Sequence, residues 1–428
     1  MEHKLRKIAI LAGGGPAPGI NSVIAAATIR ASLSGIEVVG IKDGFRWIME
    51  GDIDHIMPLT IEEVSRIHLR GGAHIGMARA NPTKNPKHLE NTVSALLRLG
   101  VDGVITIGGD DTAFSAYKLA EHSKGSLRVV HVPKTIDNDL HLPLLGNTFG
   151  FQTARHVGAG IVRDLMTDAR TTSRWYFVVA MGRKVGHLAL GIGKASGATL
   201  TLIPEEFQAK APIRLKQIED ILLGAMLKRI SHGQDDGVAV MAEGMVEVVD
   251  RKDLDEAGAR FEHDAHGHVR LDEINFGEML KLRVQERLKQ FGIKMTIVAK
   301  NVGYELRCTD PIPMDIEYTR DLGFYAAKYL EEGGSGVVVT IELDHFKPLP
   351  LSEMLDAKTG KMAMRAVDVS SEKFRVARQY MVRLNKSDFD DPHELARIAD
   401  IAKMSLDEFR TEFGYLVENE PEPITLIR

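Results

Sequence analysis

The sequence predicts an α/β protein whose sheets are mostly parallel. Short apolar segments rich in β-branched residues alternate with segments of helical period along most of the 428 residues. Two of the apolar segments, 7–12 and 101–107, stop at glycines, and a helical segment follows each of them. Such alternation is typical of βαβ units, which build parallel sheets.

The expected elements follow the periodicity of the chain. Strands are expected where apolar, β-branched runs end at turn residues, at 7–12, 101–107, 127–132, 175–181, 198–203, 237–242, 294–299 and 336–343. Helices are expected where apolar residues recur at helical spacing, at 22–31, 186–195, 212–231, 274–291, 315–331, 371–384 and 392–417. Two further helices are expected, one that begins at 112 and a separate long one that follows 147–154 and ends at about 167.

The composition indicates a globular protein without a basic surface. Hydrophobic residues make up 44% of the chain and the formal net charge is −5, so we expect no nucleic-acid partner. The one cysteine, Cys308, cannot form an internal disulfide, which agrees with a reducing cytoplasm. The first apolar segment is too short for a signal peptide, and no run approaches the length of a membrane span. We therefore expect a soluble, cytoplasmic protein.

A glycine-rich loop, 13–21, follows the first strand. Its glycines allow close approach of a phosphate, and Asn21 is a suitable cap for the next helix. A tight strand-to-helix turn explains the same residues, whereas a dinucleotide fingerprint needs a different glycine spacing.

Two acidic residues and a second polar loop follow neighbouring strands in the middle of the chain. Asp110 and Asp111 come directly after Gly108–Gly109, and the strand 127–132 leads into Lys134, Asp137 and Asp139. Parallel strands end at the same edge of a sheet, so these side chains are expected to converge. Because adjacent carboxylates repel an anionic ligand unless a cation offsets them, we expect Mg²⁺ there.

These two motifs resemble those of the phosphofructokinase family, specifically its pyrophosphate-dependent branch. They read Gly-Gly-Asp-Asp at 108–111 and Pro-Lys-Thr-Ile-Asp-Asn-Asp at 133–139, and the resemblance extends over about residues 7 to 345. It implies two similar three-layer α/β/α domains and a helical C-terminal extension. The implied boundaries are 1–148 with about 306–356 for the donor domain, 149–305 for the sugar-phosphate domain, and 357–428 for the extension.

The resemblance implies reversible, Mg²⁺-dependent transfer of a phosphoryl group from pyrophosphate to the 1-hydroxyl of fructose 6-phosphate, in glycolysis and gluconeogenesis. Asp137 would be the general base and Asp110 would hold Mg²⁺. The implied donor residues are Gly14, Arg79, Asp111 and Lys134. The implied sugar-phosphate residues are Thr135, Ile136, Asp137, Arg174, Met181, Gly182, Arg183, Glu243, Lys294, Tyr304, Glu305, Leu306 and Arg307.

Asp111 and Lys134 carry the choice of donor. ATP-using relatives generally have glycine at both positions. A carboxylate at 111 about 5 Å from the α-phosphate of a nucleotide would repel it by roughly 3 kcal/mol at an effective dielectric constant of about 20. Lys134 would place a positive charge beside the bridging oxygen of pyrophosphate. Helix capping by Asp111 and solvation of Lys134 are the alternatives that involve no donor.

Oligomerisation is implied by two basic residues. Arg174 aligns with an arginine that reaches the neighbouring subunit's site in the family, and Lys294, with Lys300 in reserve, is the candidate for a second such residue. A homodimer or homotetramer with shared active sites is therefore expected.

Three alternative functions remain open. The first is an ATP-dependent 6-phosphofructokinase, and Pro16, where many family members have aspartate, is a departure in the donor loop. The second is a non-catalytic regulatory subunit that binds a phosphosugar, although such a subunit needs no base at Asp137. The third is a dinucleotide-dependent oxidoreductase, which does not explain Asp111 or Lys134.

A polar insert is expected at about 250–275, where charged residues and histidines interrupt the pattern. His263, His266 and His268 cluster there, and a metal site is conceivable, but no cysteine accompanies them. A surface insert is the simpler interpretation.

Overall fold

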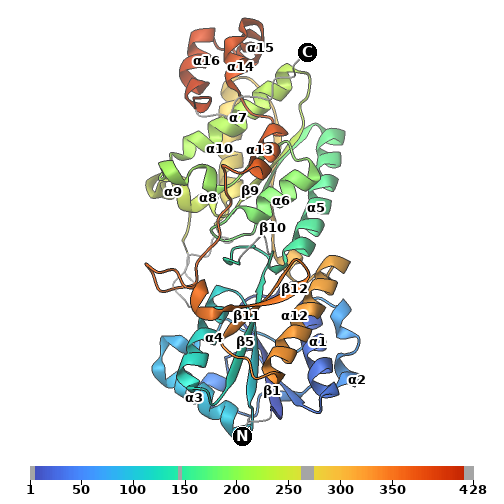
Figure 1. Ribbon diagram of the computed structural model, residues 1–428. Helices are drawn as coiled ribbons and strands as arrows, with labels where there is room; N and C mark the ends of the chain where they lie inside the picture. Colours follow the sequence, from blue (N-terminus) through green and yellow to red (C-terminus); the bar gives the residue numbers. More distant parts are fainter. Residues whose placement is uncertain (1–4, 143–146, 262–273, 419–428) are drawn as a thin grey trace. The chain divides into compact units, whose positions relative to one another are not determined.

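The computed structural model describes residues 5–142, 147–261 and 274–418 (Figure 1). The chain forms two compact units, each made of two stretches of sequence. Unit 1 consists of Met1–Ala154 and Tyr304–Arg365, and unit 2 of Arg155–Gly303 and Ala366–Arg428.

Unit 1 is built on a sheet with a parallel centre and antiparallel edges. Among the described residues the sheet has eight strands in the order β12-β11-β5-β4-β1-β2-β3, and β6 pairs with β5. Only β3 and β12 run antiparallel to their neighbours. The strands are β1 (Lys7–Ala12), β2 (Glu37–Ile41), β3 (Ile56–Pro58), β4 (Gly103–Gly108), β5 (Arg128–Thr135), β6 (Phe149–Gly150), β11 (Val337–Glu342) and β12 (His345–Pro350).

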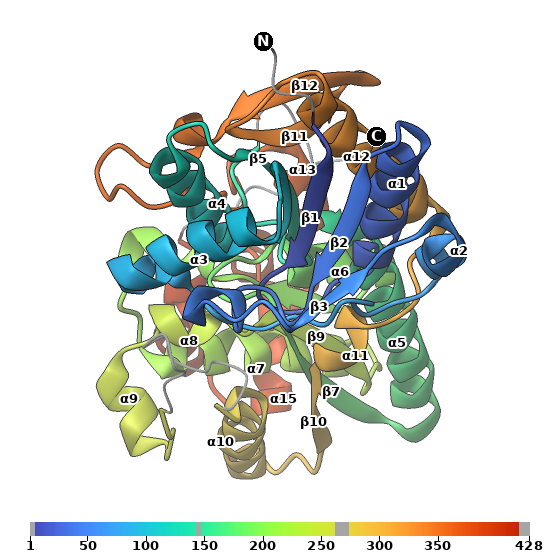
Figure 2. The same cartoon turned by 90° about the horizontal axis from the view of Figure 1, so that it is seen from below.

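Helices cover both faces of this sheet (Figure 2). Successive residues of β1 point to opposite faces, so that Ile8 and Ile10 pack with α1 and α12, and Ala9 and Leu11 pack with α3 and α4. The result is a three-layer α/β/α unit. Its helices are α1 (Ile20–Leu33), α2 (Ile61–Val64), α3 (Pro86–Arg98), α4 (Asp110–Ser123), α11 (Tyr304–Arg307) and α12 (Pro313–Glu331).

The prediction that Asn21 caps the first long helix is wrong. Helix α1 begins at Ile20 and its cap position is Gly19, with a φ of 105° that favours glycine. The Asn21 side chain instead holds the loop at 70–74, because its amide donates to the carbonyls of Arg70 and Gly71, both at 3.1 Å. Its oxygen accepts from the backbone N–H of His74 at 2.7 Å.

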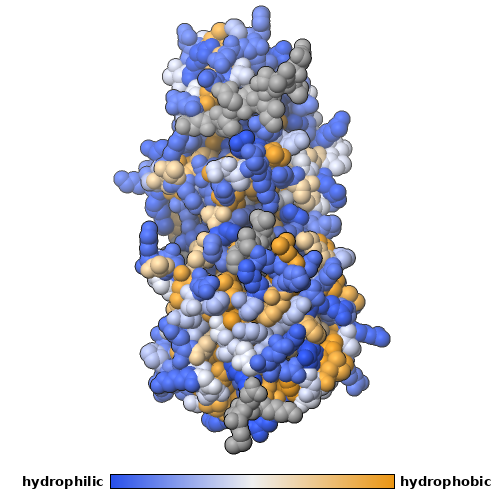
Figure 3. Space-filling model, in the orientation of Figure 1, coloured by the Kyte–Doolittle hydropathy of each residue, from blue (hydrophilic) through white to orange (hydrophobic). Residues whose placement is uncertain are grey.

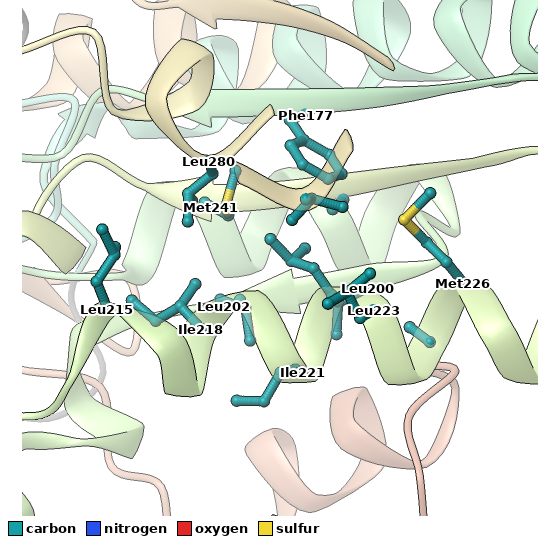
Figure 4. Packing of buried hydrophobic residues seen from close by; sticks show 14 of the residues in the cluster. Phe177, Leu200, Leu202, Leu215, Ile218, Ile221, Leu223, Met226, Met241 and Leu280 are labelled. Atoms are coloured by element: carbon teal, nitrogen blue, oxygen red, sulfur yellow. The ribbon is translucent and has the colours of Figure 1, made fainter. Parts of the chain in front are cut away.

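Unit 2 contains a smaller, fully parallel sheet. Its order is β10-β7-β9-β8, with β7 (Arg174–Ala180), β8 (Leu200–Leu202), β9 (Gly237–Ala242) and β10 (Thr296–Val302). One face packs on α7 and α10, and Figure 4 shows Phe177, Leu200, Met241 and Leu280 among the side chains of that core. Helix α6 covers the other face, where Gly193 contacts Thr201.

The helices of unit 2 include the C-terminal segment of the chain. They are α5 (Phe151–Thr172), whose first residues belong to unit 1, α6 (His187–Ser196), α7 (Leu215–Ser231), α8 (Met245–Val248), α9 (Arg251–Glu256), α10 (Phe276–Gln290), α13 (Glu372–Gln379), α14 (Lys386–Asp390), α15 (Pro392–Ala402) and α16 (Leu406–Phe413). Leu395, Ile398, Phe409 and Phe413 lie in the same core as α7 and α10.

The predicted fold class is confirmed, whereas some elements differ from their predicted bounds. Strand β12 was not expected, and the predicted helix at 392–417 is two helices, α15 and α16, separated at Lys403, whose φ is 56°. Helix α4 begins at Asp110, so both acidic residues lie in its first turn. The histidines at 263, 266 and 268 lie outside the described residues.

The surfaces of the two units are mainly hydrophilic on the face shown in Figure 3, where hydrophobic residues appear in smaller groups. Within the part of the chain that the structure describes, we find no helix of sufficient length and hydrophobicity to span a membrane.

Candidate active site

The carboxyl ends of β1, β4 and β5 bring three loops of unit 1 together. The three strands are parallel neighbours, and Ala12 of β1 lies opposite Ile107 of β4. The backbone N–H of Gly13 donates to the carbonyl of Ile107 at 2.8 Å, which joins the first glycine loop to the turn before Asp110. The expected convergence of the loops after these strands is present.

Lys134, Gly15 and Arg307 meet at this edge. The ammonium of Lys134 donates to the carbonyl of Gly15 at 2.6 Å. Gly15 has no room for a side chain, since an added Cβ would overlap the guanidinium of Arg307. Two basic groups from distant parts of the chain therefore lie at the loop that follows β1.

Burial and the neighbouring arginine lower the pKa of Lys134. Lys134 is 6% exposed, and its pKa falls to about 8, first because of burial and then because of the charge of Arg307. The charges of Asp137, Asp139 and Asp110 act in the opposite direction. Four of the predicted site residues, Lys134, Arg307, Asp137 and Asp110, are thus close enough to interact electrostatically.

The first turn of α4 presents the two acids differently. Asp110 is half-buried and Asp111 is exposed. Neither caps the helix, because the cap position is occupied by Gly109 and the cap has no side-chain hydrogen bond. Carboxylates in a first turn are stabilised by the helix dipole, and this applies to both. Asp111 is therefore available at the surface of the loop edge.

Residues 135–139 form a buried polar segment after β5. Thr135, Asp137 and Asp139 are all less than 8% exposed, and the backbone N–H of Asp137 donates to Oγ1 of Thr135 at 3.0 Å. Asn138, between the two aspartates, adopts a left-handed conformation with a φ of 58°.

Ala78, the residue before Arg79, contacts the first glycine loop through its backbone. The N–H of Gly14 donates to the carbonyl of Ala78 at 3.2 Å, and Gly13 pairs with Ala78 in a parallel bridge. Gly14 has a φ of 83°, so this approach depends on glycine. The side chain of Arg79 is exposed. The backbone of the residue before Arg79 is therefore held against Gly13 and Gly14.

Short helix α11 holds the last motif of unit 1. Leu306 is fully buried and anchors the helix, whereas Tyr304 is 64% exposed. The guanidinium of Arg307 lies 5.5 Å from the centre of the Tyr304 ring.

A second group of predicted residues lies at the carboxyl edge of the unit 2 sheet. Oε1 of buried Glu243 accepts from the backbone N–H of Gly182 at 3.1 Å and of Arg183 at 2.6 Å. Arg183 has a φ of 51°, and its carbonyl contacts Gly244 so closely that no side chain fits at 244. Glu243 therefore fixes the backbone of the loop that carries Arg183.

Comparison with known proteins identifies the family. A family profile described as Phosphofructokinase matches residues 7–330. The chain belongs to the phosphofructokinase family. The pyrophosphate--fructose 6-phosphate 1-phosphotransferase of Thermotoga maritima is 50% identical over 416 residues, which cover 96% of this chain and 99% of that protein. The protein of the same name from Naegleria fowleri is 46% identical over 418 residues, covering 96% of each chain.

The fold comparison agrees with the family. A crystal structure of a pyrophosphate-dependent phosphofructokinase from Marinobacter aquaeolei matches with a TM-score of 0.67 over 99% of this chain and 94% of that chain. The sequence identity of 16% limits this likeness to the fold. The predicted resemblance to the pyrophosphate-dependent branch of the phosphofructokinases is confirmed by the two sequence relatives.

Two predicted site residues of unit 2 lie away from the group around Glu243 in this phosphofructokinase. Arg174 is the first residue of β7 and Lys294 precedes β10, so both lie at the amino edge of the unit 2 sheet. Met181, Gly182 and Arg183 follow the other end of β7. Nε of Arg174 lies 3.7 Å from a carboxylate oxygen of Asp168. Within one chain, Arg174 and Lys294 do not join the group around Glu243.

The carboxylates of unit 1 fit a Mg²⁺ ion that takes most of its ligands from a substrate. No group of three or more His, Cys, Asp or Glu side chains that could hold a metal occurs among residues 5–142, 147–261 and 274–418. Mg²⁺ is commonly bound by one or two carboxylates together with phosphate oxygens, so Asp110 supplies a suitable ligand. Its charge acts on Lys134, so it lies near the loops that follow β1 and β5.

His131 is a buried residue that no sequence motif marks as part of the site. Its Nε2 donates to the carbonyl of Gly108 at 3.1 Å, and its Nδ1 accepts from Oγ1 of Thr106 at 2.8 Å. Burial lowers its pKa to about 3, so the ring is neutral. It supports the glycine turn that precedes Asp110. A lone histidine within a run of valines was the available signal.

Proposed function

We propose that the protein transfers a phosphoryl group from pyrophosphate to the 1-hydroxyl of fructose 6-phosphate, giving fructose 1,6-bisphosphate and phosphate. The observation that carries this proposal is the pairing of Lys134 with the Gly15 carbonyl beside Arg307, since it gathers positive charge at the loop that follows β1. The names of the two relatives with 50% and 46% identity support the same activity.

Asp137 is proposed as the general base. The attacking oxygen at carbon 1 loses its proton to the carboxylate of Asp137 as it forms a bond to the transferred phosphorus. The bond between that phosphorus and the bridging oxygen of pyrophosphate breaks, and inorganic phosphate leaves. The hydrogen bond from the Asp137 N–H to Thr135 supports this role, because it fixes the backbone that carries the carboxylate.

The donor is proposed to bind at the glycine loop of unit 1. Gly14, Arg79, Asp111 and Lys134 are the proposed donor residues. The Lys134 ammonium stabilises negative charge that builds up on the bridging oxygen in the transition state. Asp110 would hold Mg²⁺, which when bound neutralises charge on the phosphate oxygens.

The proposed sugar-phosphate residues form one group in unit 1 and another in unit 2. Each of these residues lies at the end of a parallel strand or in a short motif after it. The residues are Thr135, Ile136, Asp137, Tyr304, Glu305, Leu306 and Arg307 of unit 1 and Met181, Gly182, Arg183 and Glu243 of unit 2. The Glu243 bonds to the backbone of Gly182 and Arg183 support this part of the proposal.

Arg174 and Lys294 are proposed to serve the site of a neighbouring subunit. Their position at the amino edge of the unit 2 sheet supports this, since that edge is opposite the loop of Arg183. The proposal therefore includes a homodimer or homotetramer. We propose that the enzyme is cytoplasmic. Its one cysteine cannot form an internal disulfide, which agrees with a reducing compartment.

A donor assay tests the function. Turnover of fructose 6-phosphate is measured with pyrophosphate or ATP, each with and without Mg²⁺. We expect Mg²⁺-dependent turnover with pyrophosphate and little with ATP. The reverse preference would establish the ATP-dependent alternative, and tight binding of the sugar phosphate without turnover by either donor would favour the non-catalytic subunit.

A double variant tests the account of donor choice. Asp111→Gly with Lys134→Gly removes the proposed repulsion of a nucleotide and the proposed stabilisation of pyrophosphate. We expect turnover with ATP to rise and turnover with pyrophosphate to fall. An unchanged ratio of the two rates would remove Asp111 and Lys134 from the explanation of specificity.

A further inference from the structure

The segment around Arg365 packs on the loop that carries Asp137 and Asp139. Residues 354–364 form a hairpin in which Leu355 pairs with Met362. The return arm of the hairpin, 361–365, then pairs with the loop after Asp139, because Met364 forms an antiparallel bridge with Leu140. The backbone N–H of Arg365 donates to the carbonyl of Asp139 at 2.7 Å.

The guanidinium of Arg365 holds Asn138 through both its backbone and its side chain. Nε and Nη2 donate to the carbonyl of Asn138 at 3.3 and 3.2 Å, and Nη2 also donates to the Asn138 side-chain oxygen. All these groups belong to unit 1. Hydrogen bonds from a charged donor to a buried acceptor are stronger than neutral ones. Arg365 therefore contacts the one residue that separates Asp137 from Asp139.

Asn138 needs this support because of its backbone conformation. Its φ of 58° lies in the left-handed region, which costs a non-glycine residue free energy unless neighbouring groups hold it there. Thr148 provides a second support, since its N–H donates to the Asn138 side-chain oxygen at 3.1 Å and its hydroxyl donates to the carbonyl of Thr135 at 2.7 Å. The segment 135–139 is thus fixed from two sides.

We propose that Arg365 is a positioning residue for phosphoryl transfer, which acts by holding Asn138 in the conformation that directs the carboxylates of Asp137 and Asp139. The proposal rests on the proposed function. It extends that function to a part of the chain beyond the predicted motifs, all of which end before residue 345. The hairpin arm 361–365 thereby becomes part of the catalytic apparatus, although none of its residues is proposed to contact substrate.

Variants of the full-length protein test this role in the pyrophosphate assay. Arg365→Ala should lower kcat by about a hundredfold, as expected when a base is misplaced by about 1 Å, and should change KM for either substrate by less than about threefold. Arg365→Lys, which keeps the charge and one donor group, should recover part of the loss. The matched control is Lys361→Ala on the same arm, where the side chain is exposed and turnover should be unchanged.

A double-mutant cycle separates positioning from a structural role. Because Arg365 is proposed to act through Asn138, the effects of Arg365→Ala and Asn138→Gly on kcat should be less than multiplicative in the double variant. Thermal unfolding is measured for each variant, and Arg365→Lys carries the test if Arg365→Ala does not fold. A lowered Tm with unchanged kcat of the folded protein would overturn the inference.

The assay also distinguishes this inference from the proposed function. Turnover of the wild type with pyrophosphate, together with an unaffected kcat in Arg365→Ala, would overturn the positioning role alone. Absence of wild-type turnover with pyrophosphate would overturn both.

Discussion

The ammonium of Lys134 lies 2.6 Å from the carbonyl oxygen of Gly15, although 118 residues separate them in the chain. This bond joins the loop after β5 to the loop after β1. It also places the Lys134 ammonium, whose pKa is lowered, at the proposed donor site. The guanidinium of Arg307 lies next to it, where a side chain at position 15 would overlap it. Two predictions depend on this relationship.

The first prediction concerns the pH dependence of turnover. Because the pKa of Lys134 is lowered to about 8, the ammonium is present below that pH and is lost as the pH rises through it. The ratio kcat/KM for pyrophosphate reports the free enzyme and should therefore fall above about pH 8. In Lys134→Arg the guanidinium stays charged, so this alkaline decline should disappear within the measurable range.

A matched variant controls for general effects of the change. Lys118 lies on α4 and pairs with Glu121 at the surface, so Lys118→Arg should keep the decline near pH 8. An alkaline decline that is the same in wild type and Lys134→Arg would show that another group titrates.

The second prediction concerns Gly15. In Gly15→Ala the new methyl group displaces the guanidinium of Arg307, which is a flexible group and can move without unfolding the loop. We expect kcat/KM to fall about tenfold and the free energy of unfolding to stay nearly unchanged. Gly160→Ala in α5 is the control, because nothing lies within 4 Å of the added Cβ. Equal activity of the two variants would contradict a role for the position of Arg307.

Local patterns were sufficient to predict much of the fold. Strands β1 and β9 have the predicted bounds, since runs of apolar residues end there at turn residues. Strand β12 was missed because Pro348 and Pro350 read as a loop. Prolines are tolerated at the edge of a sheet, and among the described strands β12 lies at the edge and pairs only with β11. The pattern contains no information on which neighbour an edge strand has.

The candidate site was predicted only as far as its motifs reach. The convergence of Asp110, Lys134 and Asp137 followed from the rule that parallel strands end at one edge. The contacts of Arg307 with Gly15 and of Arg365 with Asn138 join residues far apart in sequence, and neither arginine directly follows a predicted strand. Such contacts depend on how loops fold over the sheet edge, which periodicity does not specify.

The third prediction concerns stability in acid. The pKa of His131 is about 3 in the folded protein and 6.5 in the unfolded chain, so only the unfolded chain takes up a proton between these values. The contribution of the neutral His131 ring to the free energy of unfolding is complete above pH 6.5 and is lost as the pH falls toward 3. At pH 5 the free energy of unfolding should be about 2 kcal/mol lower than at pH 7 from this residue.

Chemical denaturation at several pH values measures this contribution. His131→Asn should be less stable than wild type at pH 7, because Thr106 and Gly108 lose their partner, but its stability should decline less between pH 7 and 5. His122→Asn is the control, since His122 is exposed on α4 and the variant should keep the wild-type slope.

The fourth prediction concerns the attachment of the C-terminal helices in unit 2. The hydroxyl of Tyr415 donates to the buried carboxylate of Asp220 at 2.6 Å, and Arg287 and Lys216 pair with the same carboxylate. Tyr415→Phe removes one donor from a buried charge and should lower the free energy of unfolding by about 1–3 kcal/mol, measured by denaturant titration. Tyr380→Phe, at an 80% exposed position, should have no measurable effect.

Because the bond between Tyr415 and Asp220 lies in unit 2 and the proposed base in unit 1, Tyr415→Phe should leave kcat unchanged at temperatures where the protein is folded. Equal stability of both tyrosine variants would mean that Asp220 is satisfied without this hydroxyl.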